Sequence, residues 1–218
     1  MRNYADQQEF ILSQITNKCL HHQDLSGYDL NGIDLRAVDL SGVNLVGADL
    51  RGANLCGSIL TRANLSNANL MQANLREANL HEASLCEANL INADLTQANL
   101  CGTFLWRVKL TDSKLWGTSL CGADLSEADL SRAILIEASL IEANLVRANL
   151  AGAKLCGAIL LEANLTEANL SGADLTWANL TKTNLSEANL WETNLIYAKF
   201  RDTIMPDGTI EQPQIVVY

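Results

Sequence analysis

The side chains that most often carry catalysis or bind metals are few in this 218-residue chain and poorly spaced for either task. Its six cysteines occupy positions 19, 56, 86, 101, 121 and 156, without a CxxC pair, and its three histidines are His21, His22 and His81. Neither set has the short ligand spacing of zinc sites. No glycine-rich phosphate loop is present, and no nucleophile with a positioned base can be assembled, because the few histidines lie near the start of the chain or in a single repeat in the middle. We therefore expect no enzyme activity, no metal site and no cofactor.

Aromatic side chains are the remaining candidates for recognition, because exposed aromatic residues often anchor protein interfaces. The candidate partner-binding group lies in the stretch CGTFLWRVKLTDSKLWGTSL, residues 101–120, and comprises Phe104, Trp106 and Trp116. The second group, a candidate cap or dimer seam near the C-terminus, comprises Trp177, Trp191 and Tyr197. For the first group the alternative is a locally variable segment whose aromatic rings lie flat on their neighbours.

Charge and hydropathy narrow the class of partner. The formal net charge of −10 argues against direct nucleic-acid binding, which needs a concentrated basic face, and leaves open a basic protein partner or a surface that imitates DNA. No apolar run approaches the roughly 18–20 residues that span a bilayer. Asp6 and Glu9 precede any apolar run, so the N-terminus does not resemble a signal peptide. We expect a cytoplasmic protein whose cysteines are free thiols.

The elements that must position these residues follow from an internal repeat with a period of five. Leucine occupies every fifth position from Leu20 to Leu195, and Phe200 extends the series. From Ala48 to Ala198 a small residue, most often alanine, stands two places before each leucine, and asparagine or aspartate usually stands directly before it. The two remaining positions vary and are largely polar.

A period of five fits neither an α-helix nor a flat strand. Five steps of about 100° place successive leucines roughly 140° apart around a helix, and an odd period alternates the faces of a strand. A short extended segment that turns a corner at every repeat brings every leucine inward, and asparagine, aspartate and glycine suit such corners. The alanines then form the second inward position. This spacing alone leaves three-sided and four-sided coils open.

The segments GADLRGANL, RANLSNANLMQANLREANL and EANLTEANLSGADL resemble the A(D/N)LXX motif of pentapeptide repeat proteins. The resemblance covers residues 20–203 and implies an all-β solenoid, a right-handed quadrilateral β-helix of about nine coils. Stacked at strand spacing, the coils would form a rod of about 43 Å. The resemblance extends to cyanobacterial members, one of which regulates heterocyst differentiation, and it implies that a homodimer can form through the C-terminal coils.

The two ends of the chain depart from the repeat. Residues 1–19 are expected to form an N-terminal cap with a short helix over 4–18, and residues 204–218 a C-terminal capping tail. The tail contains a turn signal at Pro206, Asp207 and Gly208 and a segment of strand character at 215–218.

A coil with four sides would stack every twentieth residue, and several pairs of this spacing have opposite charges. Glu87, Arg107, Glu127, Arg147 and Glu167 alternate in sign along one column. Further pairs of this spacing are Asp94 with Lys114, Lys109 with Asp129, and Lys154 with Asp174. Opposite charges on neighbouring strands are mildly stabilising, so these pairs favour four sides over three.

A rod with a leucine-filled axis offers its outer faces for binding, as solenoids commonly do. We expect a protein-binding scaffold or regulator with an unknown protein partner. The resemblance implies an alternative, an acidic DNA mimic that binds DNA gyrase or another topoisomerase, like the quinolone-resistance members. Acidic residues interleaved with arginine and lysine, and a leucine register that no loop interrupts, favour the scaffold.

Overall fold

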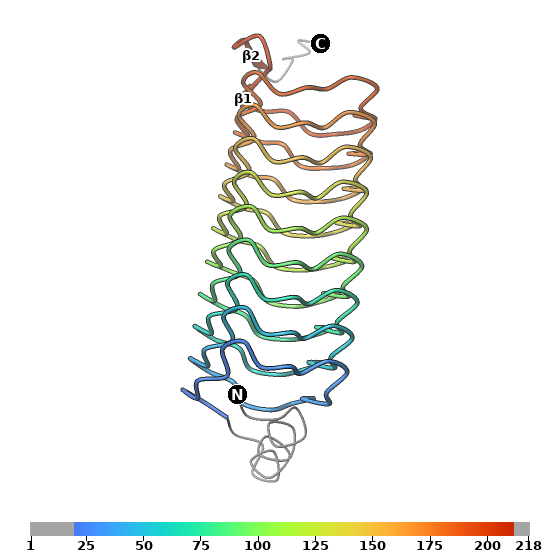
Figure 1. Cartoon of the computed structure of the whole chain (residues 1–218). Coiled ribbons are helices and arrows are strands. Elements are labelled where there is room, and N and C mark those ends of the chain that lie inside the picture. The colour runs from blue at the N-terminus through green and yellow to red at the C-terminus, as the bar shows by residue number, and fades with distance from the viewer. Residues whose placement is uncertain (1–19, 212–218) are drawn as a thin grey trace.

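The chain folds into a stack of similar coils that rises from the N-terminal to the C-terminal end (Figure 1). The structure is a computed structural model and describes residues 20–211. Its only named strands in that range are β1 (Thr203–Ile204) and β2 (Ile210–Glu211), which pair antiparallel. The helix expected over 4–18 and the strand segment at 215–218 lie outside the described residues.

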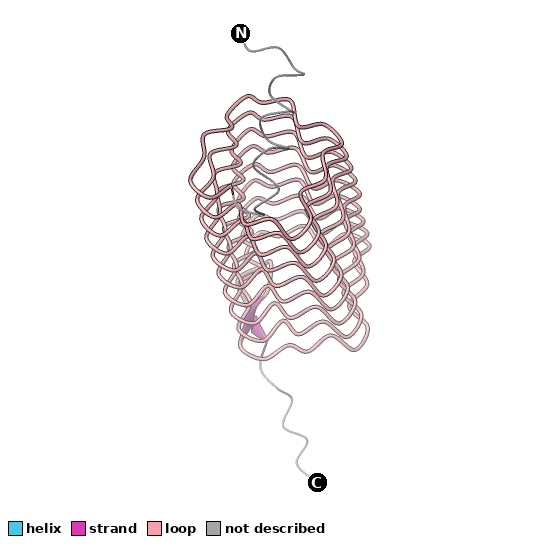
Figure 2. Cartoon of the chain, turned by 90° about the horizontal axis from the view of Figure 1, so that it is seen from below, coloured by secondary structure: helices cyan, strands magenta, loops and turns pink. Residues whose placement is uncertain are grey.

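Each coil consists of four short sides, and each side corresponds to one repeat. Isolated parallel bridges join every residue before a leucine to its counterpart four repeats later, from Asp24 with Asn44 to Asn184 with Ile204. Every bridge uses two backbone bonds, such as Leu25 N to Asn44 O at 2.7 Å and Asn44 N to Gln23 O at 2.9 Å. Figure 2 shows the coils superposed in register around a common axis. The predicted four-sided coil is confirmed, and three-sided coils are excluded.

Leucine fills the axis of the stack. From Leu20 to Leu185 every repeat leucine is at most 1% exposed, and from Ile33 to Ala188 the residue two places before each leucine is also buried. Both side chains of each of these repeats therefore point inward from one short side. Alanine suits the second position because so narrow a coil has room for only one large side chain per side.

Each corner is a tight turn whose second central residue has a left-handed backbone conformation. In the corner after Leu45, Gly47 has φ +64° and the Ala48 N–H donates to the Leu45 carbonyl at 3.0 Å. A positive φ at this position with that hydrogen bond is the pattern of a type II turn. The same position has positive φ at every corner from His22 to Asp202, and glutamate or arginine fills many of them. Backbone hydrogen bonds to the adjacent coils hold these residues in a conformation that costs an L-amino acid about 1–2 kcal/mol.

Glycine at a corner should therefore stabilise the fold through its backbone alone. Gly172 has φ +64°, and a Cβ atom built there meets nothing within 4 Å. We expect Gly172→Ala to lower the free energy of unfolding by about 1 kcal/mol, measured by urea denaturation, because only the backbone strain changes. The matched control is Ser171→Ala at the preceding position, which should change it by less than about 0.5 kcal/mol. Equal effects of the two substitutions would contradict the strain account.

The asparagine or aspartate before each leucine has a structural role. Its side-chain oxygen accepts the N–H of the residue two places later, as in Ser131 N to Asp129 Oδ1 at 3.1 Å. Asparagine also donates to the equivalent residue one coil earlier: Asn149 to Asp129 at 3.1 Å, Asn169 to Asn149 at 3.2 Å and Asn189 to Asn169 at 3.1 Å. These contacts form a side-chain ladder on the outside of the rod, beside the backbone ladder.

The coil 101–120 interrupts this side-chain ladder on all four sides while keeping the backbone ladder. The positions before its leucines hold Phe104, Lys109, Lys114 and Ser119 instead of asparagine or aspartate. Three inward positions hold hydroxyl residues, and each hydroxyl donates to a backbone carbonyl. These bonds run from Thr103 to Leu100 at 2.7 Å, from Ser113 to Leu110 at 2.6 Å and from Thr118 to Leu95 at 2.8 Å. The buried hydroxyl groups of this coil therefore all have hydrogen-bond partners, and the coil continues the repeat without an inserted residue.

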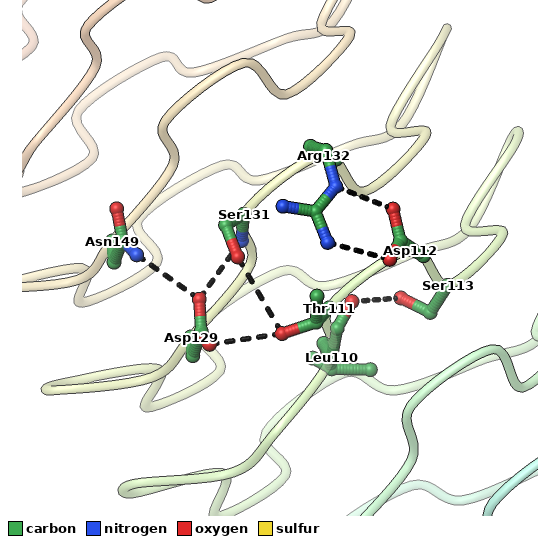
Figure 3. Close-up of polar contacts among 8 residues, drawn as sticks. All are labelled: Leu110, Thr111, Asp112, Ser113, Asp129, Ser131, Arg132 and Asn149. Atoms are coloured by element: carbon green, nitrogen blue, oxygen red, sulfur yellow. Dashed lines mark hydrogen bonds and ion pairs between the residues drawn. The ribbon is translucent and has the colours of Figure 1, made fainter.

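Polar contacts tie this coil to the next one (Figure 3). Arg132 donates to both carboxyl oxygens of Asp112, at 2.8 and 2.7 Å, and its hydrogen bonds hold the pKa of Asp112 below the usual value. Thr111 donates to Asp129 Oδ2 at 2.8 Å. Partial burial opposes ionisation of Asp129, but hydrogen bonds from Ser131, Thr111 and Asn149 outweigh it and lower its pKa.

This lowered pKa makes a pH-dependent contribution to stability. Ionised Asp129 favours the folded state at pH values above the unfolded pKa of about 4, and the contribution is lost as the pH falls through the lower folded pKa. We expect Asp129→Asn to reduce the change in the free energy of unfolding between pH 6 and pH 3. Asparagine suits the site because Asn149 occupies the same position one coil later.

Urea denaturation at several pH values measures this difference. The control is Glu187→Gln at an exposed corner, where the described chain shows no ion pair and no side-chain hydrogen bond. An Asp129→Asn variant that loses stability in acid as steeply as the wild type would show that Asp129 contributes nothing.

At the C-terminal end a short hairpin follows the last coil. Met205 takes the place of the repeat leucine and packs partly buried against the core. The predicted turn is present: Gly208 has φ +80° and donates from its N–H to the Met205 carbonyl at 2.9 Å, between β1 and β2. Within residues 20–211 no helix is long and apolar enough to cross a membrane.

Candidate functional site

The four sides of the coil give the rod four faces and four edges. We name each face by its first leucine, so that Leu20, Leu25, Leu30 and Leu35 mark them in order around the axis, and the leucines of a face recur once per coil. On each face the residue before the leucine points outward near the middle. The two residues after the leucine form the edge shared with the next face.

The structure divides the first aromatic group between two opposite faces. Phe104 and Trp106 flank Leu105 on the Leu25 face, where Phe104 is 54% exposed and Trp106 is half-buried. The Arg107 guanidinium lies 4.4 Å from the centre of the Trp106 ring and covers it. Trp116 follows Leu115 on the Leu35 face, on the other side of the rod. One flat partner surface cannot contact all three side chains.

Trp116 instead shares an edge with two residues of the C-terminal group. Trp177 and Tyr197 occupy the corner between the Leu35 and Leu20 faces, and their rings stack with centroids 4.4 Å apart and an interplanar angle of 20°. Trp116, Ile136 and Ile196 all directly follow a leucine of the Leu35 face. The backbone bonds Gly117 N to Ile136 O and Trp177 N to Ile196 O connect this column to the corner.

We call this surface the apolar edge. Its members at the corner between the Leu35 and Leu20 faces are Trp116, Ile136, Trp177, Ile196 and Tyr197, and we include Ile159, which lies beside that corner in the outward column of the Leu20 face. Among the described residues, nine large hydrophobic side chains are exposed, and five of the nine belong to this edge. Between coils 101–120 and 181–200 its three columns contain only two charged residues, Glu137 and Lys199.

Three members of the edge were not identified from the sequence. Ile136, Ile159 and Ile196 are not aromatic, and Ile159 precedes its leucine whereas the other two follow theirs. The signal that could have found them is the column of every twentieth residue through Trp116, which also contains Ile136 and Ile196. The two aromatic groups are defined by position along the chain, so Trp116 in the middle coil is separated from the C-terminal residues of the same column.

The diagonally opposite edge, between the Leu25 and Leu30 faces, is charged. The Glu127 carboxylate accepts hydrogen bonds from Arg107 at 2.7 Å and from Arg147 at 2.9 Å. Both bonds hold the pKa of Glu127 below its usual value, and the bond from Arg107 has the larger effect. Glu167 and Glu187 follow on the same column. We call these five residues the charged edge.

The predicted charge pairs are confirmed only in part. Lys114 and Asp94 form an ion pair at 3.9 Å. Lys109 with Asp129 and Lys154 with Asp174 are bridge partners as predicted, but neither pair forms an ion pair within the described residues. Glu87 likewise makes none with Arg107, because Arg107 binds Glu127.

Trp191 lies apart from the other C-terminal aromatics. It follows Leu190 on the Leu30 face, is 70% exposed and points toward a different edge from Trp177 and Tyr197. The C-terminal coils also expose Leu190, Leu195 and Phe200 in part. A homodimer through these coils stays a prediction.

The apolar edge is a long surface on which a partner could bind. The apolar edge runs parallel to the rod axis over five coils, about 19 Å at strand spacing. Within residues 20–211 no cluster of three or more histidine, cysteine or acidic side chains could hold a metal ion. An apolar line bordered by polar faces is the kind of surface that marks a protein interaction site.

Comparisons with known proteins identify the same five-residue repeat as that of a known family. The family model described as pentapeptide repeats matches in eight copies between residues 20 and 207, among them 20–57, 68–107, 107–140 and 143–181. HetL, a pentapeptide repeat protein involved in heterocyst differentiation regulation from the cyanobacterium Nostoc sp. strain PCC 7120, is 33% identical. That alignment covers 92% of this chain and 98% of HetL, with a TM-score of 0.38.

Two more distant structures match over most of the chain. QnrB1, a plasmid-mediated fluoroquinolone resistance protein, is 17% identical over 83% of this chain and 89% of its own, with a TM-score of 0.49. Rfr23, a pentapeptide repeat protein from the cyanobacterium Cyanothece 51142, is 21% identical over 91% of this chain and 99% of its own, with a TM-score of 0.18. No curated protein matches. Because the family model matches over most of residues 20–207, the chain belongs to the pentapeptide repeat family, whose fold is a right-handed β-helix.

Proposed function

We propose that this chain is a non-enzymatic scaffold or regulator that binds a partner protein along its apolar edge. The observation that carries the proposal is the gathering of exposed hydrophobic side chains: of the nine among the described residues, four lie at this one corner and a fifth, Ile159, lies in the adjoining column of the Leu20 face. Isolated exposed hydrophobic residues are normal on protein surfaces, but a continuous row of them marks an interaction site. The identity to HetL, a protein involved in regulation of differentiation, supports a regulatory role.

The shape of the edge suggests the form of the partner. A line of about 19 Å matches the length of an α-helix of about 13 residues. The apolar stripe of an amphipathic helix could lie along Trp116, Ile159 and Trp177. Its polar residues would then face serine and asparagine side chains on the Leu20 face and mainly charged side chains on the Leu35 face. The three columns of the row contain only Glu137 and Lys199 as charged residues. The outward column of the Leu35 face, on one side of the row, contains Lys114, Lys154 and Asp174, so charge complementarity can contribute on that side.

The second candidate is an acidic mimic of DNA that binds DNA gyrase. The net charge of −10 favours it, and the resemblance to quinolone-resistance members makes it the relevant alternative. Mimicry of DNA would require rows of unpaired acidic side chains. On the charged edge, however, Glu127 is neutralised by two arginines. A gyrase supercoiling assay separates the candidates: inhibition of supercoiling, or protection of gyrase from a quinolone, would support the mimic and contradict the scaffold.

Affinity capture from an extract of the source organism tests the scaffold. Three baits are compared: the wild type, an apolar-edge variant with Trp116→Ala and Trp177→Ala, and a charged-edge variant with Arg107→Ala and Arg147→Ala. We expect one protein to be retained by the wild type and the charged-edge variant and lost from the apolar-edge variant. Retention by the apolar-edge variant would contradict the proposed surface.

A further inference from the structure

Two cysteines of neighbouring coils lie together at the edge between the Leu20 and Leu25 faces, outside the apolar edge. Cys101 and Cys121 each follow a leucine of the Leu20 face and occupy the same position one coil apart. The Gly102 N–H donates to the Cys121 carbonyl at 2.9 Å, so their backbones belong to adjacent, hydrogen-bonded turns. Adjacent strands lie about 4.7–4.9 Å apart, which falls within the Cα separation that a disulfide spans. The five described cysteines are free thiols in the structure.

Serine hydroxyls connect the two thiols in a continuous row. Cys101 Sγ lies 3.0 Å from Ser119 Oγ, and Ser119 Oγ lies 3.6 Å from Cys121 Sγ. Cys121 Sγ in turn lies 3.2 Å from Ser139 Oγ. Cys121 therefore has two hydroxyls that can donate to its sulfur, whereas Cys101 has one, which it shares.

The two hydroxyls bear on the charge state of Cys121. Partial burial opposes ionisation of this thiol, but hydrogen bonds from Ser139, Ser119 and Cys101 outweigh it, so the pKa of Cys121 lies below its usual value. The thiolate is the form of cysteine that reacts with oxidants, and its reactivity follows thiolate character and exposure. Both cysteines are partly exposed, so a small oxidant can reach them.

The other described cysteines lack this arrangement. Cys86 Sγ accepts one longer contact, from Ser84 Oγ at 3.7 Å, and donates to the Phe104 carbonyl at 3.9 Å, and no second described cysteine lies in its column one coil away. Cys56 and Cys156 share the column of Trp116 but lie several coils apart. Cys19 lies outside the described residues.

A histidine helps to fix the backbone of the pair. His81 occupies the same position as Cys101 one coil earlier, and its Nδ1 donates to the Cys101 carbonyl at 2.9 Å. Its imidazole therefore contacts the main chain of the pair and leaves the two sulfur atoms to the serine row.

We propose that Cys121 and Cys101 form a peroxide-reactive pair, in which Cys121 is the reacting thiol and Cys101 the resolving thiol. The Cys121 thiolate attacks a hydroperoxide, so that an S–O bond forms and the O–O bond breaks. The leaving oxygen takes up the proton released by the thiol and departs as an alcohol, or as water from hydrogen peroxide. The Cys101 thiol then attacks the sulfur of the sulfenic acid, an S–S bond forms, the S–O bond breaks, and the hydroxide leaves as water with the proton of the Cys101 thiol. In total one hydroperoxide is reduced and two thiols are oxidised to a disulfide that links adjacent coils.

The test is oxidation of the full chain with one equivalent of hydrogen peroxide, followed by alkylation of the remaining thiols and peptide mass spectrometry. Cys86 and Cys101 lie on the same tryptic peptide, residues 77–107, so the experiment uses a Cys86→Ser background. We expect an intramolecular Cys101–Cys121 disulfide as the main product. With Cys101→Ser added, we expect sulfenic acid to accumulate at Cys121, trapped by dimedone at a rate about tenfold above that of Cys156.

Matched variants separate reactivity from simple exposure. Ser139→Ala removes a hydroxyl that contacts Cys121 and none that contacts Cys101, so it should slow dimedone labelling of Cys121 and leave Cys156 unchanged. In urea all cysteines should react alike. Equal reaction of Cys121 and Cys156 in the folded chain, or disulfides formed mainly with other cysteines or between chains, would overturn the proposal.

Discussion

Replacing Trp116 or Trp177 with Ala is expected to weaken binding of the captured partner by about 30-fold for each residue, equivalent to about 2 kcal/mol. Large aromatic side chains at the centre of an interface contribute most of its binding energy. Trp116 is 46% and Trp177 57% exposed in the free chain, so both still have much apolar surface to bury. Titration of the purified partner by isothermal calorimetry measures each loss.

The control shows whether the loss belongs to the edge or to the fold. Arg107→Ala and Arg147→Ala on the charged edge should leave the affinity within about threefold, because these side chains face away from the partner. Trp177→Ala also removes the stack on Tyr197, so its melting temperature is compared with that of Trp116→Ala, which removes no ring contact recorded in the structure. Affinity losses of equal size from both edges would contradict a single binding surface.

Leu125→Ala is expected to lower the free energy of unfolding by about 2–5 kcal/mol, the usual range for removing a fully buried leucine side chain. Leu125 is 0% exposed and lies between Leu105 and Leu145 of the same face. Each coil is stabilised mainly by its neighbours, so a cavity in the middle of the array weakens two interfaces between coils. Urea denaturation followed by circular dichroism measures the change.

Leu195→Ala is the matched control for that substitution. Leu195 occupies the same repeat position in the last full coil, where it is only partly buried. Its loss should cost less than half as much, because less surface is removed from contact and fewer coils lie beyond it. Equal losses at the two positions would show that burial along the axis does not determine stability.

The sequence predicts the scaffold well because a single short motif encodes it. Leucine at every fifth position defines the core, and opposite charges at every twentieth position favour the four sides that the bridges confirm. The corners are less evident from the sequence. Glu127 and Arg147 are good helix formers, yet they adopt positive φ because the hydrogen bonds of adjacent coils decide the conformation.

The candidate site could be predicted only in part, because closeness in sequence misleads in a coil. Trp106 and Trp116 are separated by half a turn, so they face opposite directions. Trp116 and Tyr197 lie far apart in the sequence but are separated by close to four whole turns, so they share an edge. The ion pairs show a similar limit. Arg107 has an acidic residue on the coil before it and on the coil after it, and it pairs with Glu127, so Glu87 lacks the partner expected from the sequence.

Two deletions test most directly the central claim that the partner binds the edge which four-sided stacking creates. The one-coil deletion, of residues 141–160, removes a whole turn and with it Ile159, but Trp177 and Tyr197 remain in line with Trp116 and Ile136. The one-side deletion, of residues 141–145, keeps leucine at every fifth position but rotates everything after residue 145 by one face. Trp177 then takes the place of Gly172, on a different edge.

Both deletion variants are expected to fold, as checked by their thermal unfolding, because both preserve the inward leucines. The measurement is their affinity for the partner. We predict that the one-coil deletion binds within about tenfold of the wild type, and that the one-side deletion loses at least as much affinity as Trp177→Ala. Equal binding by the two variants, or stronger binding by the one-side deletion, would contradict the claim.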